Sequence, residues 1–289
     1  MTKRLLVQFF HPGPEFDRAA DRANWTDQNQ PHRRKFMQVR GRRAEGTGSG
    51  GDDLAIWGEW EPQAECVQTL NGLGVGLPKR LWRPYYDLST APPNRLNTDP
   101  LVFGGFRYTV CQQHRRYNSG WRPSGLQQLA AGSVILFGSH LDGDFVLDTM
   151  FVVKEGRRHN PSSYLHLSTP QPYVDITLAT LYEGVSDRGC CKTPDPGDQY
   201  TLYDGATDDE PFEGMYSFVP CKPIGLGEPG FARPRIRHPL LSSTQTQRYG
   251  FPVDGNDDAI VAVWREVRDQ VLGQDLALAT WLEFPPRRP

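Results

Sequence analysis

Three consecutive segments decide the fold: Gly132-Ser-Val-Ile-Leu-Phe-Gly138, Leu141-Asp-Gly143 and Asp144-Phe-Val-Leu-Asp-Thr-Met-Phe-Val-Val153. The first is a short, strongly apolar run between two glycines, which is typical of a buried β-strand. The second contains an Asp-Gly pair, the dipeptide that favours a tight hairpin turn. The third is long and rich in β-branched and aromatic residues. Together they predict two antiparallel strands joined by a two-residue turn.

Alternation along the second of these strands assigns its side chains to two faces. Phe145, Leu147, Phe151 and Val153 fall on one face, and Val146, Asp148, Met150 and Val152 on the other. Asp148 is therefore a charged group on an apolar face. A buried carboxylate in such a place either pairs with an arginine or has a raised pKa, and the second case marks a candidate catalytic group. Ser139, just after the first strand, is a candidate for binding substrate.

Strand patterns also dominate the rest of the chain. They cover residues 4–10, 54–57, 106–111, 174–183, 200–203, 215–219 and 276–284. Helical patterns are fewer: a short one at 124–132, and an amphipathic one at 257–272 with Ile260, Val263, Trp264, Val267 and Val271 on its apolar side. We predict an α+β, mainly β fold, built on a curved antiparallel or mixed sheet or a partly open barrel, with a C-terminal amphipathic helix. We expect residues 1–289 to form a single compact domain, with any sub-division near 157–172.

Composition excludes several classes of protein. The 29 Gly and 25 Pro among 289 residues exclude a long-helix or coiled-coil protein, and 14 Phe, 11 Tyr and 7 Trp exclude a disordered chain. No apolar run approaches the length of about 20 residues that spans a bilayer, so we expect no membrane partner. The five Cys follow no zinc spacing, which predicts reduced thiols and a cytoplasmic location. We expect no metal and no cofactor.

The formal net charge of −2 hides separate basic and acidic segments. Residues 106–125 carry four Arg and His114 without an acid, and residues 231–250 carry four Arg and His238 without an acid. Residues 195–213 carry seven acids without a basic residue. This distribution excludes a protein that coats nucleic acid uniformly, but it allows a local phosphate-binding face.

Consecutive basic residues make the first candidate binding segment, His32-Arg33-Arg34-Lys35. Neighbouring side chains on a strand point to opposite sides, so the three cations cannot all face one way. A loop or turn could gather two of them with His32 around a phosphate, because guanidinium groups bind phosphate in a bidentate way. We add Arg116 to these phosphate-binding candidates. A plain solvated surface remains the alternative.

Tryptophan and glutamate interleave in Ile56-Trp-Gly-Glu-Trp-Glu-Pro62. On a strand, Trp57, Glu59 and Glu61 would share one face and Trp60 would take the other. An exposed indole beside carboxylates can stack on a nucleobase and accept hydrogen bonds from its edge, and a buried carboxylate can act as a general base. The alternative is the edge of a core strand, with Glu59 paired to an arginine.

The segment Asn94–Gly105 is rich in turn residues. Asn97-Thr98-Asp99-Pro100 is typical of a turn, but the same polar groups would serve a ligand loop. We take Asn97 and Phe103 as candidates for binding substrate and Asp99 as a candidate catalytic residue.

The succession of His-Arg-Arg-Lys-Phe, Trp-Gly-Glu-Trp-Glu-Pro, Asn-Thr-Asp-Pro and Val-Ile-Leu-Phe-Gly-Ser resembles an uncharacterised bacterial family over most of the chain. The segments Gly132–Gly138 and Phe145–Val153 resemble strands of PUA-like modules of the EVE and ASCH type, over about a third of the chain. The resemblance implies a small β-barrel that holds a modified base in an aromatic pocket. It assigns no catalytic residue.

We therefore expect a protein that recognises a nucleotide or modified nucleobase, free or within DNA or RNA. Its chemistry would be the cleavage or hydrolysis of a nucleoside-type bond in nucleic-acid modification or defence. The candidate catalytic residues are Glu59, Glu61, Asp99 and Asp148. The alternatives are a small-molecule metabolic enzyme that uses paired carboxylates as acid and base, and an interaction module without catalysis. The sequence leaves the oligomeric state open.

Overall fold

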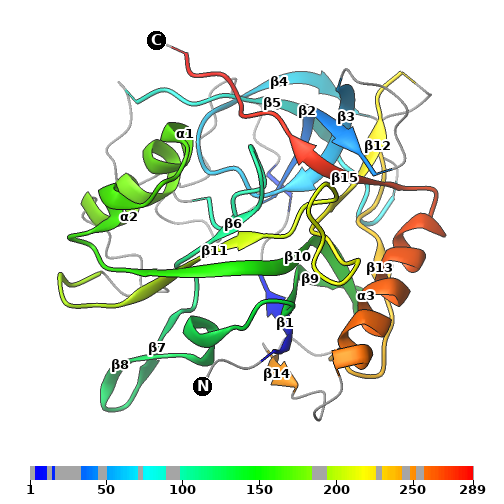
Figure 1. Ribbon diagram of the computed structural model, residues 1–289. Coiled ribbons are helices and arrows are strands. Elements are labelled where there is room, and N and C mark those ends of the chain that lie inside the picture. The colour runs from blue at the N-terminus through cyan, green and yellow to red at the C-terminus, as the bar shows by residue number, and fades with distance from the viewer. Residues whose placement is uncertain are drawn as a thin grey trace.

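The computed structural model describes residues 4–11, 15–16, 34–44, 51–70, 74–88, 98–183, 194–225, 230–242, 248–251 and 257–288. The fold is mainly β with few helices, as the strand patterns predict. Two larger sheets carry most of the strands, and a two-stranded hairpin accompanies them (Figure 1).

The first sheet is built on the predicted hairpin. Strands β9 (Val134–Leu141) and β10 (Asp144–His159) are antiparallel, and the turn between them has positive φ at Asp142 (52°) and Gly143 (84°). Strand β1 (Leu6–Phe10) runs parallel to β9. The sheet order is β14-β1-β9-β10-β11-β6, where β13 also pairs with β10. The remaining members are β6 (Arg107–Tyr108), β11 (Tyr200–Gly205), β13 (Arg235–Ile236) and β14 (Arg248–Phe251).

A register shift at Asp148 divides β10 into two parts. Leu147 pairs with Gly138 and Thr149 with Phe137, so Asp148 is an extra residue in the ladder. The predicted alternation holds up to this bulge and is wrong beyond it, because one inserted residue exchanges the two faces. Phe145 and Leu147 consequently pack in the same cluster of buried apolar side chains as Met150 and Val152. Phe151 and Val153 pack in a different cluster.

The second sheet contains a closed ring of four antiparallel strands. These are β2 (Lys35–Arg43), β3 (Asp52–Gly58), β12 (Val219–Pro223) and β15 (Ala277–Leu282), and β15 pairs with β2 to close the ring. Gly41 lies at the closure, where a Cβ atom would lie 2.5 Å from the carbonyl oxygen of Trp281. Strands β5 (Arg80–Pro84) and β4 (Ala64–Thr69) extend the sheet beyond β2.

The segment 174–183 is helical, so the predicted strand there is wrong. The helical region begins three residues earlier and consists of α1 (Gln171–Tyr173), a π-helical turn over Val174–Leu178 and α2 (Ala179–Glu183). Its buried side chains are Tyr173, Ile176, Thr177, Leu178, Thr180 and Leu181. Apart from Leu178, they recur at the spacing of three and four residues that marks a helix face, and the β-branched residues obscure it in the sequence.

Other expected elements differ mainly in length. The strand expected at 215–219 begins only at Val219, and the one at 106–111 shortens to β6. The short helix is a 3₁₀ turn (Gly125–Gln128) whose first turn is capped by Ser124, which accepts from the Leu126 N–H. A second 3₁₀ turn covers Tyr164–His166.

Helix α3 (Asp257–Leu272) follows its prediction and covers one of the two larger core clusters. Its predicted apolar face is buried in the cluster that also contains Leu136 and Met150. The other cluster lies between the two sheets and includes Phe9, Met37 and Phe137. None of the helices among the described residues is long and apolar enough to cross a membrane.

Residues of the acidic segment make ion pairs with distant basic residues. Asp204 pairs with Arg157, Asp209 with Arg42, and Glu213 with Arg4. These contacts join β11 and the segment after it to three separate strands or strand ends. The acidic segment is therefore a partner of the protein's own basic residues.

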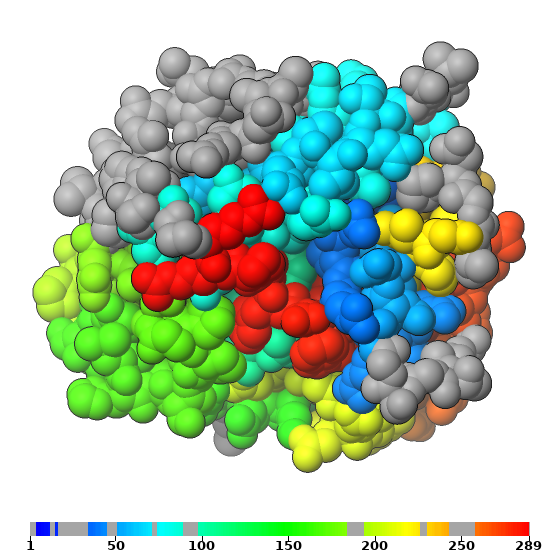
Figure 2. All heavy atoms as spheres, turned by 90° about the horizontal axis from the view of Figure 1, so that it is seen from above, coloured from blue at the N-terminus to red at the C-terminus, as the bar shows by residue number. Residues whose placement is uncertain are grey.

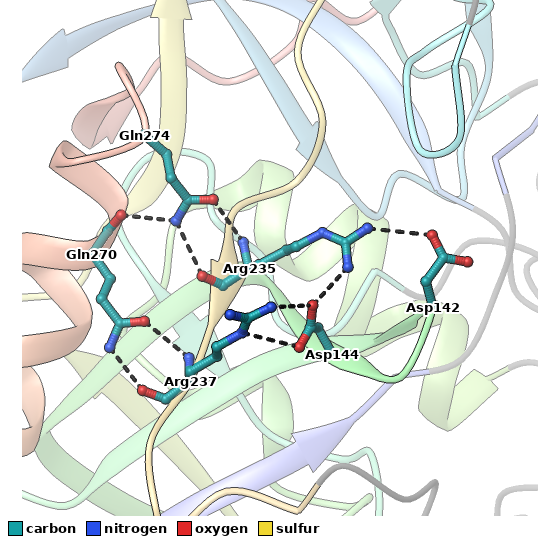
Figure 3. A network of polar contacts seen from close by, with 6 residues as sticks. All are labelled: Asp142, Asp144, Arg235, Arg237, Gln270 and Gln274. Atoms are coloured by element: carbon teal, nitrogen blue, oxygen red, sulfur yellow. Dashed lines mark hydrogen bonds and ion pairs between the residues drawn. The ribbon is translucent and has the colours of Figure 1, made fainter.

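Two glutamine amides attach β13 to the end of α3 (Figure 3). Gln270 accepts from the N–H of Arg237 and donates to its carbonyl oxygen, both at 2.9 Å. Gln274 makes the same two contacts with Arg235, both at 3.0 Å. Each side-chain amide thus replaces a neighbouring strand for one residue, Arg235 within β13 and Arg237 just after it.

We predict that the double variant Gln270→Ala/Gln274→Ala unfolds with a free energy lower by about 2 kcal/mol, because it loses the four hydrogen bonds to Arg235 and Arg237, which are partly open to water. Urea denaturation measures the difference. Gln128→Ala, which removes an exposed glutamine of the 3₁₀ turn, is the control and should leave the midpoint unchanged. A double variant as stable as the control would contradict the attachment.

Candidate functional site

A cluster of buried charges forms where the Asp148 bulge meets the start of β2. Arg34 Nε donates to Asp148 Oδ2 at 2.5 Å, and Arg233 Nη1 lies 3.3 Å from Asp148 Oδ1. The same Arg233 nitrogen donates to Ser139 Oγ at 2.5 Å. We call Arg34, Ser139, Asp148 and Arg233 the arginine cluster. Of the two alternatives for a buried Asp148, pairing with arginine is confirmed.

Burial determines the electrostatics of this cluster. The guanidinium of Arg34 is 1% exposed, and desolvation lowers the pKa of Arg34 to about 10 although the Asp148 carboxylate opposes the shift. Two guanidinium groups face one carboxylate within the cluster, and the Asp148 carboxylate binds one of them through each of its oxygens.

A histidine and a glutamate lie directly beside the arginine cluster. The Nδ1 atom of His11 is in ion-pair contact with Glu59 Oε1, and the carbonyl of His11 accepts from Arg34 Nη2. The backbone N–H of His11 donates to Gly138 O at 2.7 Å, which continues the pairing of β1 with β9. Glu59 follows β3 and is partnered by a histidine, so the arginine partner in the core-edge alternative is wrong.

These groups reach the surface along a narrow edge. The exposed fractions of the side chains are 8% for Asp148, 8% for Glu59, 9% for His11 and 11% for Arg233. The hydrogen bonds that Arg233 makes with the described residues all come from Nη1, so its Nε and Nη2 remain able to donate to a ligand. The guanidinium of Arg233 also lies 6.0 Å from the centre of the Trp57 ring, which limits its motion.

Lys35 points to the opposite side of β2 from Arg34. Its ammonium group donates to Trp60 O at 2.5 Å and Pro62 O at 3.0 Å, and the side chain is fully buried. Burial lowers the pKa of Lys35 to about 7, with the nearby Glu61 charge acting against the shift. The expectation that the consecutive cations diverge is therefore confirmed for Arg34 and Lys35.

Asp99 is buried in a separate loop. Its carboxylate accepts from the backbone N–H groups of Thr109 at 2.9 Å, Val110 at 2.6 Å and Cys111 at 2.7 Å. Desolvation nevertheless raises the pKa of Asp99 to about 6. The neighbouring Thr98 accepts from the Glu61 N–H through its hydroxyl, which links this loop to the segment after β3. These contacts give Asp99 a structural task, the fixing of the loop at 109–111.

The aromatic residues expected to form a base-binding wall lie in the core. Trp57 is 5% exposed, and Trp60 and Phe103 are fully buried. The indole N–H of Trp57 donates to Phe231 O, and that of Trp60 donates to Gln63 O. The predicted stacking surface is therefore wrong, because both rings are buried on both faces by core side chains. Trp57 and Trp60 do belong to different core clusters, as expected for opposite faces.

The remaining candidates lie elsewhere. Arg116 is exposed on a hairpin separate from the arginine cluster. His32, Arg33 and Asn97 lie outside the described residues. Sequence reasoning missed His11 and Arg233. Arg233 belongs to the basic segment 231–250, which contains no acid, and this composition could have marked it as a binding candidate. Its contact with Asp148 could not be predicted, because the two residues are far apart along the chain.

Two surface cavities lie away from the arginine cluster. One, of about 370 Å³, is lined by Asp144, Arg237 and His238 among others. The second, of about 320 Å³, lies between β2, β5 and the C-terminal segment and is lined by Arg40, Arg83 and Phe284 among others. Figure 2 shows the red C-terminal segment against the blue and cyan strands at this second cavity. None of the residues predicted to form a site lines either cavity.

Comparison of the chain with protein-family models, curated proteins and solved structures found no match. A function therefore has to be argued from the chemistry of the arginine cluster and its neighbours. Within the described ranges, no three His, Cys, Asp or Glu side chains gather in a way that would hold a metal ion.

We predict that Asp148→Asn destabilises the protein by about 3–5 kcal/mol, because it removes the carboxylate that pairs with the buried Arg34 and with Arg233. Chemical denaturation measures the loss. Asp144→Asn is a matched control, since Asp144 also bridges two arginines, Arg235 and Arg237, but at the surface. Equal losses in the two variants would show that burial does not determine the strength of the Asp148 contacts.

We predict a pH-dependent difference between the wild type and Lys35→Met. Above pH 7 the folded protein releases the Lys35 proton, whereas the unfolded chain keeps it up to the ordinary pKa of 10.5. The unfolding free energy of the wild type should therefore gain up to about 1.4 kcal/mol per pH unit between pH 7 and 9 relative to the variant. Denaturation at several pH values tests this, and parallel stability curves would contradict it.

Proposed function

We propose that the protein binds a nucleotide or a related phosphate-bearing ligand at the exposed edge of the arginine cluster. One observation carries the proposal: Arg233 is held in place by Asp148, Ser139 and Trp57, yet keeps two donor nitrogens for a ligand. A guanidinium fixed in this way loses little freedom on binding and can hold two phosphate oxygens at once.

The two arginines of the cluster have different roles. The Asp148 carboxylate receives a hydrogen bond from Arg34 and from Arg233. A phosphate would bind Arg233 through the two nitrogens that Asp148 and Ser139 do not use. Arg34 would act indirectly, because it is buried and holds the carboxylate against which Arg233 is positioned.

His11 and Glu59 supply a proton-transferring pair for the cleavage of a nucleoside-type bond. A carboxylate on one ring nitrogen orients the imidazole and stabilises its protonated form, and an imidazole is the side chain best suited to exchange protons near neutral pH. In this proposal Glu59 positions His11, and His11 is the acid–base group. Trp57 supports Arg233 from the core and does not stack on the base.

Calorimetric titration with nucleoside monophosphates and triphosphates tests the binding. We predict that Arg233→Gln weakens binding about 10-fold to 100-fold, the range expected for losing charge-assisted hydrogen bonds. Arg235→Gln is the matched control, since Arg235 is a surface arginine two residues further on. Loss of binding in both variants, or in neither, would contradict the assignment to Arg233.

Titration with nucleosides and with inorganic phosphate shows which part of the nucleotide the protein binds. Binding of phosphorylated but not of unphosphorylated nucleosides supports the proposal. Turnover of a nucleotide mixture, followed by mass spectrometry, then tests catalysis with His11→Gln and Glu59→Gln. Turnover of phosphate-free metabolites alone would favour the small-molecule enzyme. If no compound binds at millimolar concentration, the interaction module would be favoured.

A further inference from the structure

A hairpin of basic and aromatic residues lies outside the two larger sheets. Strand β7 (His114–Tyr117) pairs with β8 (Gly120–Pro123), and in the described part of the chain neither pairs with another strand. Figure 1 shows this hairpin at the lower left, on the opposite side of the molecule from α3 and β13. It is thus a separate surface from the arginine cluster, which includes a residue just before β13.

The base of the hairpin is fixed to the body of the protein. The Gln113 amide donates to Thr201 O at 2.6 Å and accepts from the Thr201 N–H at 2.8 Å, which attaches the hairpin to β11. Ser124 closes the other end, where its N–H donates to Gln113 O at 2.9 Å. A two-stranded hairpin alone is marginally stable in water, so these contacts give it a defined position.

The exposed part of the hairpin presents cations and rings on both faces. Arg115 lies directly across from Arg122, and Arg116 directly across from Trp121. Arg116 and Arg122 are exposed, Trp121 is partly exposed, and Tyr117 is 50% exposed. The described residues offer no carboxylate to Arg116 or Arg122, and the whole segment 106–125 contains no acid.

This arrangement is complementary to an anionic partner that carries flat apolar groups. Arg116 and Arg122 have no carboxylate partner among the described residues, and Tyr117 and Trp121 keep part of their rings in water. A partner with repeated negative charges and flat apolar groups would pair with the arginines and cover the rings. Single-stranded nucleic acid has this composition, because its phosphates pair with arginine and its unstacked bases pack on aromatic rings.

We infer that the β7–β8 hairpin binds single-stranded nucleic acid, with Arg116 and Arg122 on phosphates and Tyr117 and Trp121 against bases. The inference goes beyond the nucleotide site at the arginine cluster and does not depend on it. A duplex is a poorer partner, because its bases are stacked on one another and cannot pack on Tyr117 and Trp121.

Fluorescence anisotropy with labelled single-stranded oligonucleotides tests the inference, using oligo-dT and oligo-U in separate arms. We predict that Arg116→Ala/Arg122→Ala weakens binding at least 10-fold. The slope of log K against log salt should also become shallower by about 1.4, or about 0.7 for each phosphate that an arginine no longer neutralises. Arg265→Ala, which removes an exposed arginine of α3, is the matched control and should bind as the wild type does.

A second variant, Tyr117→Ala, tests stacking without a change of charge. It should weaken binding several-fold and leave the salt slope unchanged, and circular dichroism and thermal unfolding establish that each variant is folded. Absence of binding by the wild type at 50 mM salt, or unchanged binding by the double arginine variant, would overturn the inference. Equal affinity for duplex and single strands would overturn the single-strand assignment. Arg233→Gln should bind the oligonucleotides normally, so the two proposals fail separately.

Discussion

The structure depends on the pairing of buried charges at the Asp148 bulge. An extra residue in β10 directs a carboxylate toward Arg34, at the start of β2, and toward Arg233, just before β13. Because a buried guanidinium without a counter-charge is costly, this contact joins the first sheet to the second and fixes the segment before β13. The same requirement brings His11 and Glu59 to the cluster, so the chemistry of the candidate site follows from what holds the sheets together.

Side-chain amides form a second set of connections between distant segments. Gln8 binds the backbone of Ser242, Gln113 that of Thr201, Gln270 that of Arg237 and Gln274 that of Arg235, each through one donated and one accepted hydrogen bond. A short strand or loop that lacks a neighbour has unsatisfied backbone groups, and a glutamine amide satisfies one donor and one acceptor together. This device allows irregular segments to lie beside regular sheets without exposing a long strand edge.

The two proposed binding sites differ in how far their arginines are exposed to water. The arginine cluster is almost entirely buried, so its charges are strongly positioned and interact in surroundings of low dielectric. The β7–β8 hairpin carries its arginines in water, where they attract a polyanion at long range but contribute little to stability.

The sequence by itself determined the features that depend on neighbouring residues. The Asp-Gly turn, the strands it joins and helix α3 all follow from local pattern, whereas the sequence left open whether a buried Asp148 pairs with arginine or has a raised pKa. Tertiary structure decided the rest. The bulge reverses the faces of β10, the helix at 171–183 replaces an expected strand, and Trp57, Trp60 and Phe103 enter the core. His11, Arg34 and Arg233 meet because parallel pairing of β1 with β9 and burial of charge bring them together, and no local pattern encodes contacts between residues so far apart.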